Sequence, residues 1–218
     1  MTRRFDLLIF DWDGTLADST ALITSSIQLA FADAGLPVPS RRDASFVIGY
    51  GLSDAMQHLA PQASTTQIAR IVEAYKHHYL ARDGEIALFE GVQDALAHYR
   101  QAGYQLAVAT GKSRRGLDRV LDQTGLGVCF DATRCADECH SKPHPQMIEE
   151  LLEVLEVDTS RAVMVGDTTH DLQMAVNANT ASLAVSYGAH PREDLAAMAP
   201  LGLFDSFTEL DSWLRKHG

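Results

Sequence analysis

The stretch LLIFDWDGT at residues 7–15 decides the fold of this chain. Its first four residues form a short apolar run, which is typical of a buried parallel strand. Asp11, Trp12, Asp13 and Gly14 follow directly. The strand is therefore expected to present carboxyl groups at its carboxyl end, the edge of an open α/β sheet where ligands bind.

After residue 84, short apolar runs alternate with segments of helical periodicity. The expected strands cover residues 105–109, 132–135, 162–165 and 182–186, and the expected helices cover residues 91–102, 116–124, 145–156, 172–178 and 209–216. Strands that alternate with helices predict an α/β fold with a doubly wound parallel sheet that is covered on both faces.

Between the first and second strands, the chain is expected to be helical throughout. Apolar residues recur at helical spacing after Asp18, and Asp18 or Ser19 is a candidate cap of that helix. Ser64 is the expected cap of a later helix in the same region. The expected domains are an α/β core of residues 1–17 and 85–218 and an inserted α-helical cap of residues 18–84.

The chain has 218 residues and a formal net charge of -11 at pH 7. Its length suits a core domain with a modest insertion. The negative charge argues against nucleic acid as a partner, because binding needs a basic face. No apolar run approaches the roughly 20 residues that span a bilayer, and the first ten residues lack the pattern of a signal peptide. We expect a cytoplasmic enzyme without a membrane partner, either a monomer or a homodimer.

Acidic residues are expected at the carboxyl ends of two strands. Asp11, Asp13 and Asp167 would repel one another if they converged, and their hard oxygen atoms favour Mg²⁺ as the neutralising ion. Two carboxylates that are two residues apart can divide the work, one attacking while the other donates a proton. Gly14 allows backbone N–H groups to approach a phosphate closely.

Hydroxyl and ammonium groups are expected at the same edge of the sheet. Thr110 ends the second strand, and Lys142 precedes the helix that leads into the fourth strand. Such groups suit the non-bridging oxygens of a phosphoryl group in transfer. Gly111 and Lys112 are candidate substrate-binding residues beside Thr110, although Lys112 is equally open to interpretation as a solvated residue.

Four segments together resemble the motifs of the haloacid dehalogenase (HAD) superfamily. They are DWDGTLADS at 11–19, Thr110 after an apolar strand, KPHP at 142–145 and GDTTHD at 166–171. Their order and spacing match the family, and the resemblance covers nearly the whole chain. The helical insertion after the first motif is similar to the cap of the phosphoglycolate phosphatase and β-phosphoglucomutase branch.

The resemblance implies a role for each matching residue. Asp11 would attack phosphorus and form an aspartyl-phosphate, while Asp13 would protonate the leaving alkoxide and then activate water. Asp11, the backbone carbonyl of Asp13, and Asp167 would bind Mg²⁺. Thr110 and Lys142 would hold the phosphoryl oxygens.

Several residues stay open to two interpretations. Asp171 either orients Lys142 or holds a metal-bound water. Gly49 and Gly51 form either a loop that faces the substrate or a plain turn between helices. His170, which occupies a variable position of the fourth motif, is expected to be exposed in a loop. The three cysteines do not match the usual spacing of a zinc site.

The expected activity is Mg²⁺-dependent hydrolysis of the phosphate monoester of a small metabolite, such as phosphoglycolate. Phosphoryl transfer like that of β-phosphoglucomutase is an alternative, because it uses the same motifs. A non-catalytic HAD-like binding protein is the alternative from another class, although no motif is lost. The phosphonatase branch needs a lysine in the cap, and this chain has none between Trp12 and Tyr75. The metal-independent dehalogenase branch lacks the Asp13-Gly14 pair.

Overall fold

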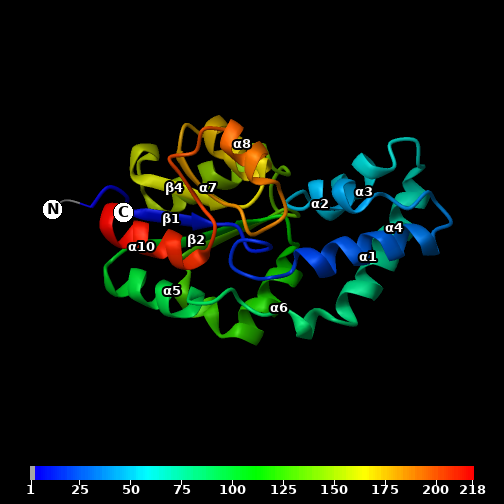
Figure 1. The fold of residues 1–218 in the computed structure, drawn as a ribbon, viewed down its shortest axis with the longest axis horizontal. Coiled ribbons are helices and arrows are strands. Elements are labelled where there is room, and N and C mark those ends of the chain that lie inside the picture. The colour runs from blue at the N-terminus through cyan, green and yellow to red at the C-terminus, as the bar shows by residue number, and fades with distance from the viewer. Residues whose placement is uncertain (1–2) are drawn as a thin grey trace.

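The computed structural model describes residues 3–218 and contains a six-stranded sheet (Figure 1). The strands are β1 (Leu7–Phe10), β2 (Gln105–Thr110), β3 (Ala132–Cys135), β4 (Ala162–Gly166), β5 (Ala181–Val185) and β6 (Gly202–Phe204). Their order is β3-β2-β1-β4-β5-β6, and all neighbouring strands are parallel. The predicted doubly wound α/β fold is confirmed. Residues 1 and 2 of the expected core lie outside the described residues.

Strand β1 lies in the middle of the sheet, between β2 and β4. Phe10 is level with Val108 of β2 and with Val165 of β4, and all four residues of β1 are buried. Burial on both faces explains why this strand is apolar throughout and does not alternate with polar residues. Because the winding of the sheet reverses at β1, a crevice forms outside its carboxyl end, beside Asp11.

Helices cover both faces of the sheet, and successive side chains of β1 point to opposite faces. Leu8 and Phe10 pack with α5, α6 and α10, whereas Leu7 and Ile9 pack with α7 and α8. Figure 1 shows these two groups of helices on opposite sides of the strands. The helices are α5 (Val92–Gln101), α6 (Arg114–Thr124), α7 (Gln146–Leu155), α8 (Thr169–Asn177), α9 (Arg192–Ala197) and α10 (Phe207–His217). Among residues 3–218, every helix falls short of the length or apolarity that a bilayer crossing requires.

The first four helices after β1, all of which precede α5, stand at one end of the sheet (Figure 1). They are α1 (Thr20–Asp33), α2 (Arg41–Phe46), α3 (Leu52–Leu59) and α4 (Thr65–Leu80), and they share a hydrophobic cluster of their own. The chain enters and leaves this region through adjacent backbone segments: the N–H of Asp18 donates to Ala87, and the N–H of Phe89 donates to Leu16.

Several short elements escaped the sequence analysis. Helices α2 and α9 have six residues each and β6 has three, which is too short to establish a periodicity. Helix α8 begins at Thr169 and not at Leu172, because its first turn is polar and carries residues of the fourth motif. Ser19 does precede α1, but its side chain does not cap the helix and donates instead to Asp13. Three short 3-10 helices, η1 (Asp83–Glu85), η2 (Leu126–Cys129) and η3 (Thr159–Arg161), complete the fold.

The start of α4 yields a prediction about stability. The Ser64 hydroxyl accepts a hydrogen bond from the N–H of Gln67, whose side chain accepts one from the N–H of Ser64. We expect Ser64→Ala to lower the free energy of unfolding by about 1 kcal/mol, because the capping box is lost. Urea denaturation measures this change, and Ser53→Ala in the exposed first turn of α3 is the matched control. Equal losses in the two variants would contradict the prediction.

Candidate active site

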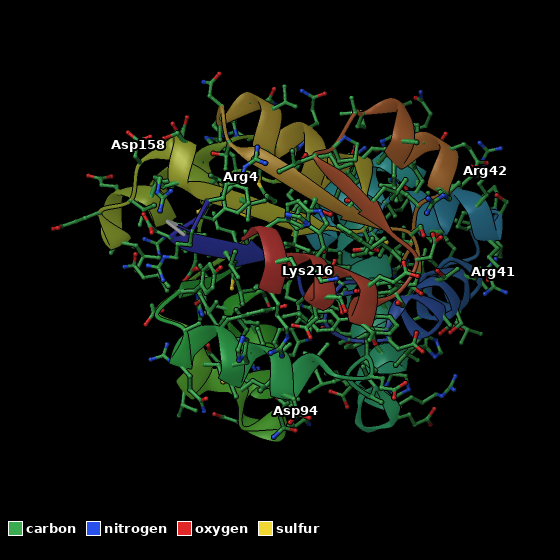
Figure 2. All side chains as sticks on the ribbon, turned by 60° about the vertical axis from the view of Figure 1, so that its left-hand side comes forward. Arg4, Arg41, Arg42, Asp94, Asp158 and Lys216 are labelled. Atoms are coloured by element: carbon green, nitrogen blue, oxygen red, sulfur yellow. The ribbon has the colours of Figure 1, made fainter. Side chains whose placement is uncertain are left out.

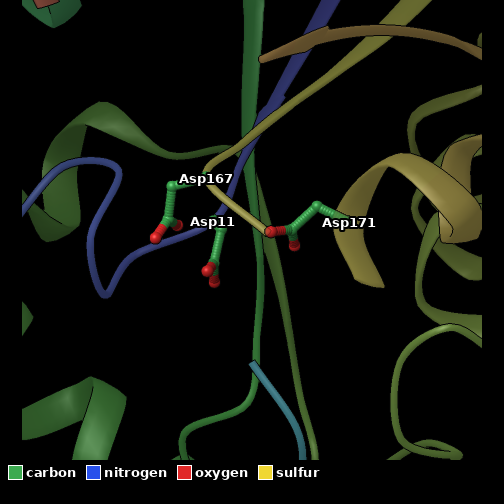
Figure 3. A group of neighbouring side chains, drawn as sticks. All are labelled: Asp11, Asp167 and Asp171. Carbon is green, nitrogen blue, oxygen red and sulfur yellow. The ribbon is translucent and has the colours of Figure 1, made fainter. Parts of the chain in front are cut away.

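Three buried carboxyl groups converge at the carboxyl end of the central strands (Figure 3). Asp11 follows β1, Asp167 follows β4, and Asp171 lies in the first turn of α8. One carboxylate oxygen from each lies within 4.8 Å of the others. The sheet therefore brings together residues that are up to 160 positions apart in the chain, and it holds them in the crevice beside β1.

Lys142 is the buried cation of this cluster. Its Nζ lies 2.9 Å from Asp11 Oδ1 and 2.6 Å from Asp171 Oδ1. Burial alone lowers the pKa of Lys142, but the two carboxylates outweigh it and hold that pKa above its usual range. Asp171 uses its other oxygen to accept hydrogen bonds from the N–H and hydroxyl of Thr168. Both oxygens of Asp171 thus have hydrogen-bond partners. This fixed carboxylate is well placed to orient the ammonium group of Lys142.

The carboxylate of Asp167 is held by two segments, the turn after β1 and the loop after β5. Its Oδ1 accepts a hydrogen bond of 2.9 Å from the hydroxyl of Thr15, and its Oδ2 accepts one of 2.7 Å from the N–H of Ala189. A Cβ on Gly14 or Gly188 would lie 2.2 or 2.1 Å from Asp167 Oδ2, so any side chain at either position would displace the carboxylate. The sequence analysis missed the contribution of Gly188 and Ala189, because no motif marks the loop after β5.

The carboxylate cluster fits a divalent metal ion. Asp11 Oδ2 is buried and has no hydrogen-bond partner among residues 3–218. Burial raises the pKa of Asp11 to about 7, and it raises the pKa of Asp167 well above its usual value. Buried oxygens that lack partners and resist ionisation are stabilised by a cation.

The Asp13 side chain points away from this cluster. Its Oδ1 accepts a hydrogen bond of 2.6 Å from the Ser19 hydroxyl and forms an ion pair of 3.0 Å with Lys112 Nζ. Lys112 also donates to the hydroxyl of Tyr79, 2.9 Å away on α4. The side chain of Lys112 is largely buried. Through Lys112, a chain of hydrogen bonds joins the carboxyl group of Asp13 to the helical region.

The loop between α2 and α3 packs directly on the end of β2. The side chain of Thr110 is buried there, and its hydroxyl accepts a hydrogen bond from the N–H of Lys112. A Cβ on Gly111 would lie 2.6 Å from the carbonyl oxygens of Gly49 and Tyr50. The missing side chain at position 111 therefore allows the loop that contains Gly49 to approach the strand end.

Two histidines form hydrogen bonds to the end of α2, close to the loop that contains Gly49. His170 Nε2 lies 2.7 Å from the carbonyl oxygen of Phe46, and His190 Nε2 lies 3.0 Å from the same atom. A carbonyl oxygen only accepts, so both nitrogens donate. The expectation that His170 is exposed is wrong: burial also lowers its pKa to about 4, and it donates as a neutral ring. Sequence reasoning missed this role because the partner is a backbone atom 124 residues away.

A cleft of about 900 Å³ separates the strand ends from the four helices. Asp11 and Asp13 lie on its floor, together with Gly111 and Lys112. The opposite wall is formed by α1, α3, α4 and the loop that contains Tyr50. A concave site with a few convergent polar groups and titrating residues of altered pKa is typical of an active site.

The family of the chain follows from comparison with known proteins. Residues 8–185 match the model of the haloacid dehalogenase-like hydrolases. The chain belongs to this family, as its motifs predicted.

Named relatives agree with this assignment. A protein of Dickeya dadantii named "Probable phosphatase IndB" is 36% identical over 209 residues, which are 94% of this chain and 91% of the relative. Pyrophosphatase PpaX of Bacillus velezensis is 30% identical and covers 95% of both chains. A structure described as a predicted phosphoglycolate phosphatase from Haemophilus somnus has a TM-score of 0.83 and 25% identity, and covers 96% of this chain and 98% of its own. The predicted class of enzyme, a phosphatase of this family, is confirmed.

The close contact at Gly111 yields a prediction about catalysis. We expect Gly111→Ala to lower kcat/KM for a phosphate ester by about tenfold or more, because the new Cβ would push the Gly49 loop away from the strand end. The melting temperature should fall as well, because the clash is with backbone atoms, so the kinetics are measured where the variant is folded. Steady-state kinetics measures the effect, and Gly127→Ala is the control, since its Cβ would meet only Leu121 at 3.8 Å. Unchanged kinetics in Gly111→Ala would show that catalysis does not depend on the close contact between the Gly49 loop and the strand end.

The raised pKa of Asp11 yields a prediction about pH. The folded value of about 7 exceeds the ordinary value of 3.8, so the fold favours the protonated group. In EDTA, wild-type stability relative to Asp11→Asn should therefore fall as the pH rises from about 4 to about 7. Urea denaturation of both proteins at several pH values measures this difference. A difference that is constant across this range would contradict the prediction.

Proposed function

We propose that the protein hydrolyses the phosphate monoester of a small metabolite by Mg²⁺-dependent catalysis, with Asp11 as the nucleophile. One observation carries the proposal: Asp11 is buried at the floor of the cleft, between Lys142 and Asp167, with an oxygen that lacks any partner among residues 3–218. Such an atom is suited to attack a phosphorus atom held in front of it.

In the first step, a carboxylate oxygen of Asp11 attacks phosphorus, and the bond between phosphorus and the substrate's alcohol oxygen breaks. Asp13 gives its proton to that alcohol oxygen as it leaves. Lys142 and the hydroxyl of Thr110 hold the non-bridging phosphoryl oxygens, with Gly14 leaving room for backbone N–H groups. The product of this step is an aspartyl-phosphate on Asp11 and a free alcohol.

In the second step, Asp13 accepts a proton from a water molecule, which attacks the phosphorus of the aspartyl-phosphate. The bond between phosphorus and Asp11 breaks, inorganic phosphate leaves, and both carboxyl groups return to their starting states. Asp13 would act in its protonated form in the first step and in its ionised form in the second, and the ionised form is the one that pairs with Lys112 and accepts a hydrogen bond from Ser19.

Asp11, Asp167 and the backbone carbonyl of Asp13 are the groups that would hold Mg²⁺. A bound Mg²⁺ neutralises the carboxylates and stabilises the charge that develops on the phosphoryl group. Asp171 would keep Lys142 in place, because it forms an ion pair with that lysine and is itself held in the capping box of α8 by Thr168.

Residues 18–84 would act as a cap domain on a core formed by the residues before and after them. Support comes from the separate hydrophobic cluster of this region and from the paired connections near Asp18 and Phe89. Closure of the cap excludes bulk water from the phosphoryl group and strengthens its electrostatic contacts.

The first test is phosphate release with Mg²⁺ and with EDTA, in wild type and in Asp11→Asn. We expect Asp11→Asn to lower kcat by at least about a thousandfold without loss of fold, because the nucleophile is removed. Asp54→Asn, at an exposed carboxyl group that also lines the cleft, is the matched control and should retain activity. Phosphoglycolate and pyrophosphate belong in the substrate panel. Turnover by Asp11→Asn at the wild-type rate would refute the mechanism.

A further inference from the structure

Helix α2 approaches the strand ends with its carboxyl end. Arg41 and Arg42, in its first turn, are exposed and lie at the outside of the molecule (Figure 2). Phe46 is the last residue of the helix, and the carbonyl oxygens of a last helical turn have no donor within the helix. The Phe46 carbonyl oxygen instead accepts from the Nε2 atoms of His170 and His190, both of which are buried. Side chains outside the four helices thus supply the donors that this helix end needs.

Residues 45–51, which we call the docking segment, form further hydrogen bonds beside the candidate catalytic groups. The hydroxyl of Ser45 donates one of 2.8 Å to the carbonyl oxygen of Ala189. The N–H of Gly51 donates one of 2.8 Å to the hydroxyl of Ser141. These partners and the two histidines adjoin or hold three buried polar groups of the site, namely Asp167, Lys142 and Asp171. The docking segment therefore contacts the supports of the groups that are proposed to bind the metal ion and the phosphoryl oxygens.

The imidazole of His170 packs against the docking segment. Its ring centroid lies 4.2 Å from that of Tyr50 and 5.0 Å from that of Phe46. Its Nε2 carries the proton of the hydrogen bond to Phe46, because a carbonyl oxygen cannot donate. The following residue is Asp171, which pairs with Lys142. A single side chain therefore links the docking segment to the turn of α8 that holds the buried lysine.

His190 donates to the same carbonyl oxygen but also forms a second hydrogen bond. Its Nδ1 accepts one of 3.1 Å from the N–H of Thr169, at the start of α8, so its proton lies on Nε2. Replacing His190 would therefore disturb α8 as well as the docking segment. The bond from His170 is the one whose loss can be tested with less effect on that helix.

We propose that His170 is a positioning residue for the reaction: its N–H holds the Phe46 carbonyl and so docks residues 45–51 against the site. The inference rests on the proposed phosphatase function and goes beyond it, because His170 is not among the residues that line the cleft and acts through other residues. Without this hydrogen bond, the docking segment separates more often from Ser141 and Ala189, and water reaches the groups around Lys142. Chemistry then slows, because the phosphoryl oxygens are held less firmly in the reactive position.

The kinetic test compares two variants of equal side-chain length at position 170. The amide nitrogen of His170→Gln extends about as far as Nε2 and can donate to the Phe46 carbonyl, whereas His170→Met has no donor. Both variants lose the imidazole ring, so a role in packing alone would give equal effects. With p-nitrophenyl phosphate and Mg²⁺, we expect kcat to fall about tenfold in His170→Met and less than about threefold in His170→Gln. His217→Asn, at an exposed histidine of α10, is the matched control and should retain the wild-type kcat.

Amide hydrogen exchange measures docking without turnover. In the docked state the N–H of Gly51 is bonded to Ser141, so its exchange should be slow. We expect exchange across residues 47–51 to be at least about fivefold faster in His170→Met than in His170→Gln. His170→Asn, whose shorter amide does not reach the Phe46 carbonyl, takes the place of His170→Met if that variant fails to fold, with the same expected result.

Failure of this inference is distinguishable from failure of the proposed function. Equal kcat or equal exchange in the variants with and without a donor at position 170 would overturn the role of His170 and leave the phosphatase proposal intact. A wild-type protein that releases no phosphate from p-nitrophenyl phosphate, phosphoglycolate or pyrophosphate would refute the proposed function, and with it the role of His170 in catalysis.

Discussion

The repulsion among three buried carboxyl groups is the constraint on which the rest of the site depends. Asp11, Asp167 and Asp171 lie together with one buried ammonium group, that of Lys142, so the cluster lacks positive charge. Burial makes this imbalance costly, which is why the pKa of Asp11 is raised. A divalent cation would offset the excess, and the same potential would then favour a phosphoryl group. The same carboxyl groups that would serve catalysis therefore destabilise the metal-free fold.

Helices α1 to α4 and the carboxylate cluster share structural supports. The loop after β5 donates to Asp167 through the N–H of Ala189, and the next residue, His190, donates to the carbonyl of Phe46 in α2. Lys112 joins Asp13 to Tyr79 of α4 in the same manner. Docking of the four helices is thus coupled to the geometry of the groups that would carry the chemistry.

The sequence by itself determined the architecture and the inventory of reactive groups. A wholly apolar run before Asp11 indicates a strand buried on both faces, and the alternation after residue 84 indicates a parallel sheet. Parallel strands end at one edge, so Asp11, Thr110 and Asp167 were expected at the same edge of the sheet. The motifs were therefore sufficient to predict the family and the polar floor of the cleft. Short elements such as α2 escaped, because six residues carry no usable periodicity.

Only the tertiary structure decided how these groups are paired. The engagement of both oxygens of Asp171, the turn of Asp13 toward Lys112 and the burial of His170 depend on contacts between distant segments, some with backbone atoms. The need for glycine at position 188 has the same origin, because only the folded chain brings it against Asp167. Local sequence patterns encode periodicity and turn chemistry, whereas such contacts arise from packing across the whole chain.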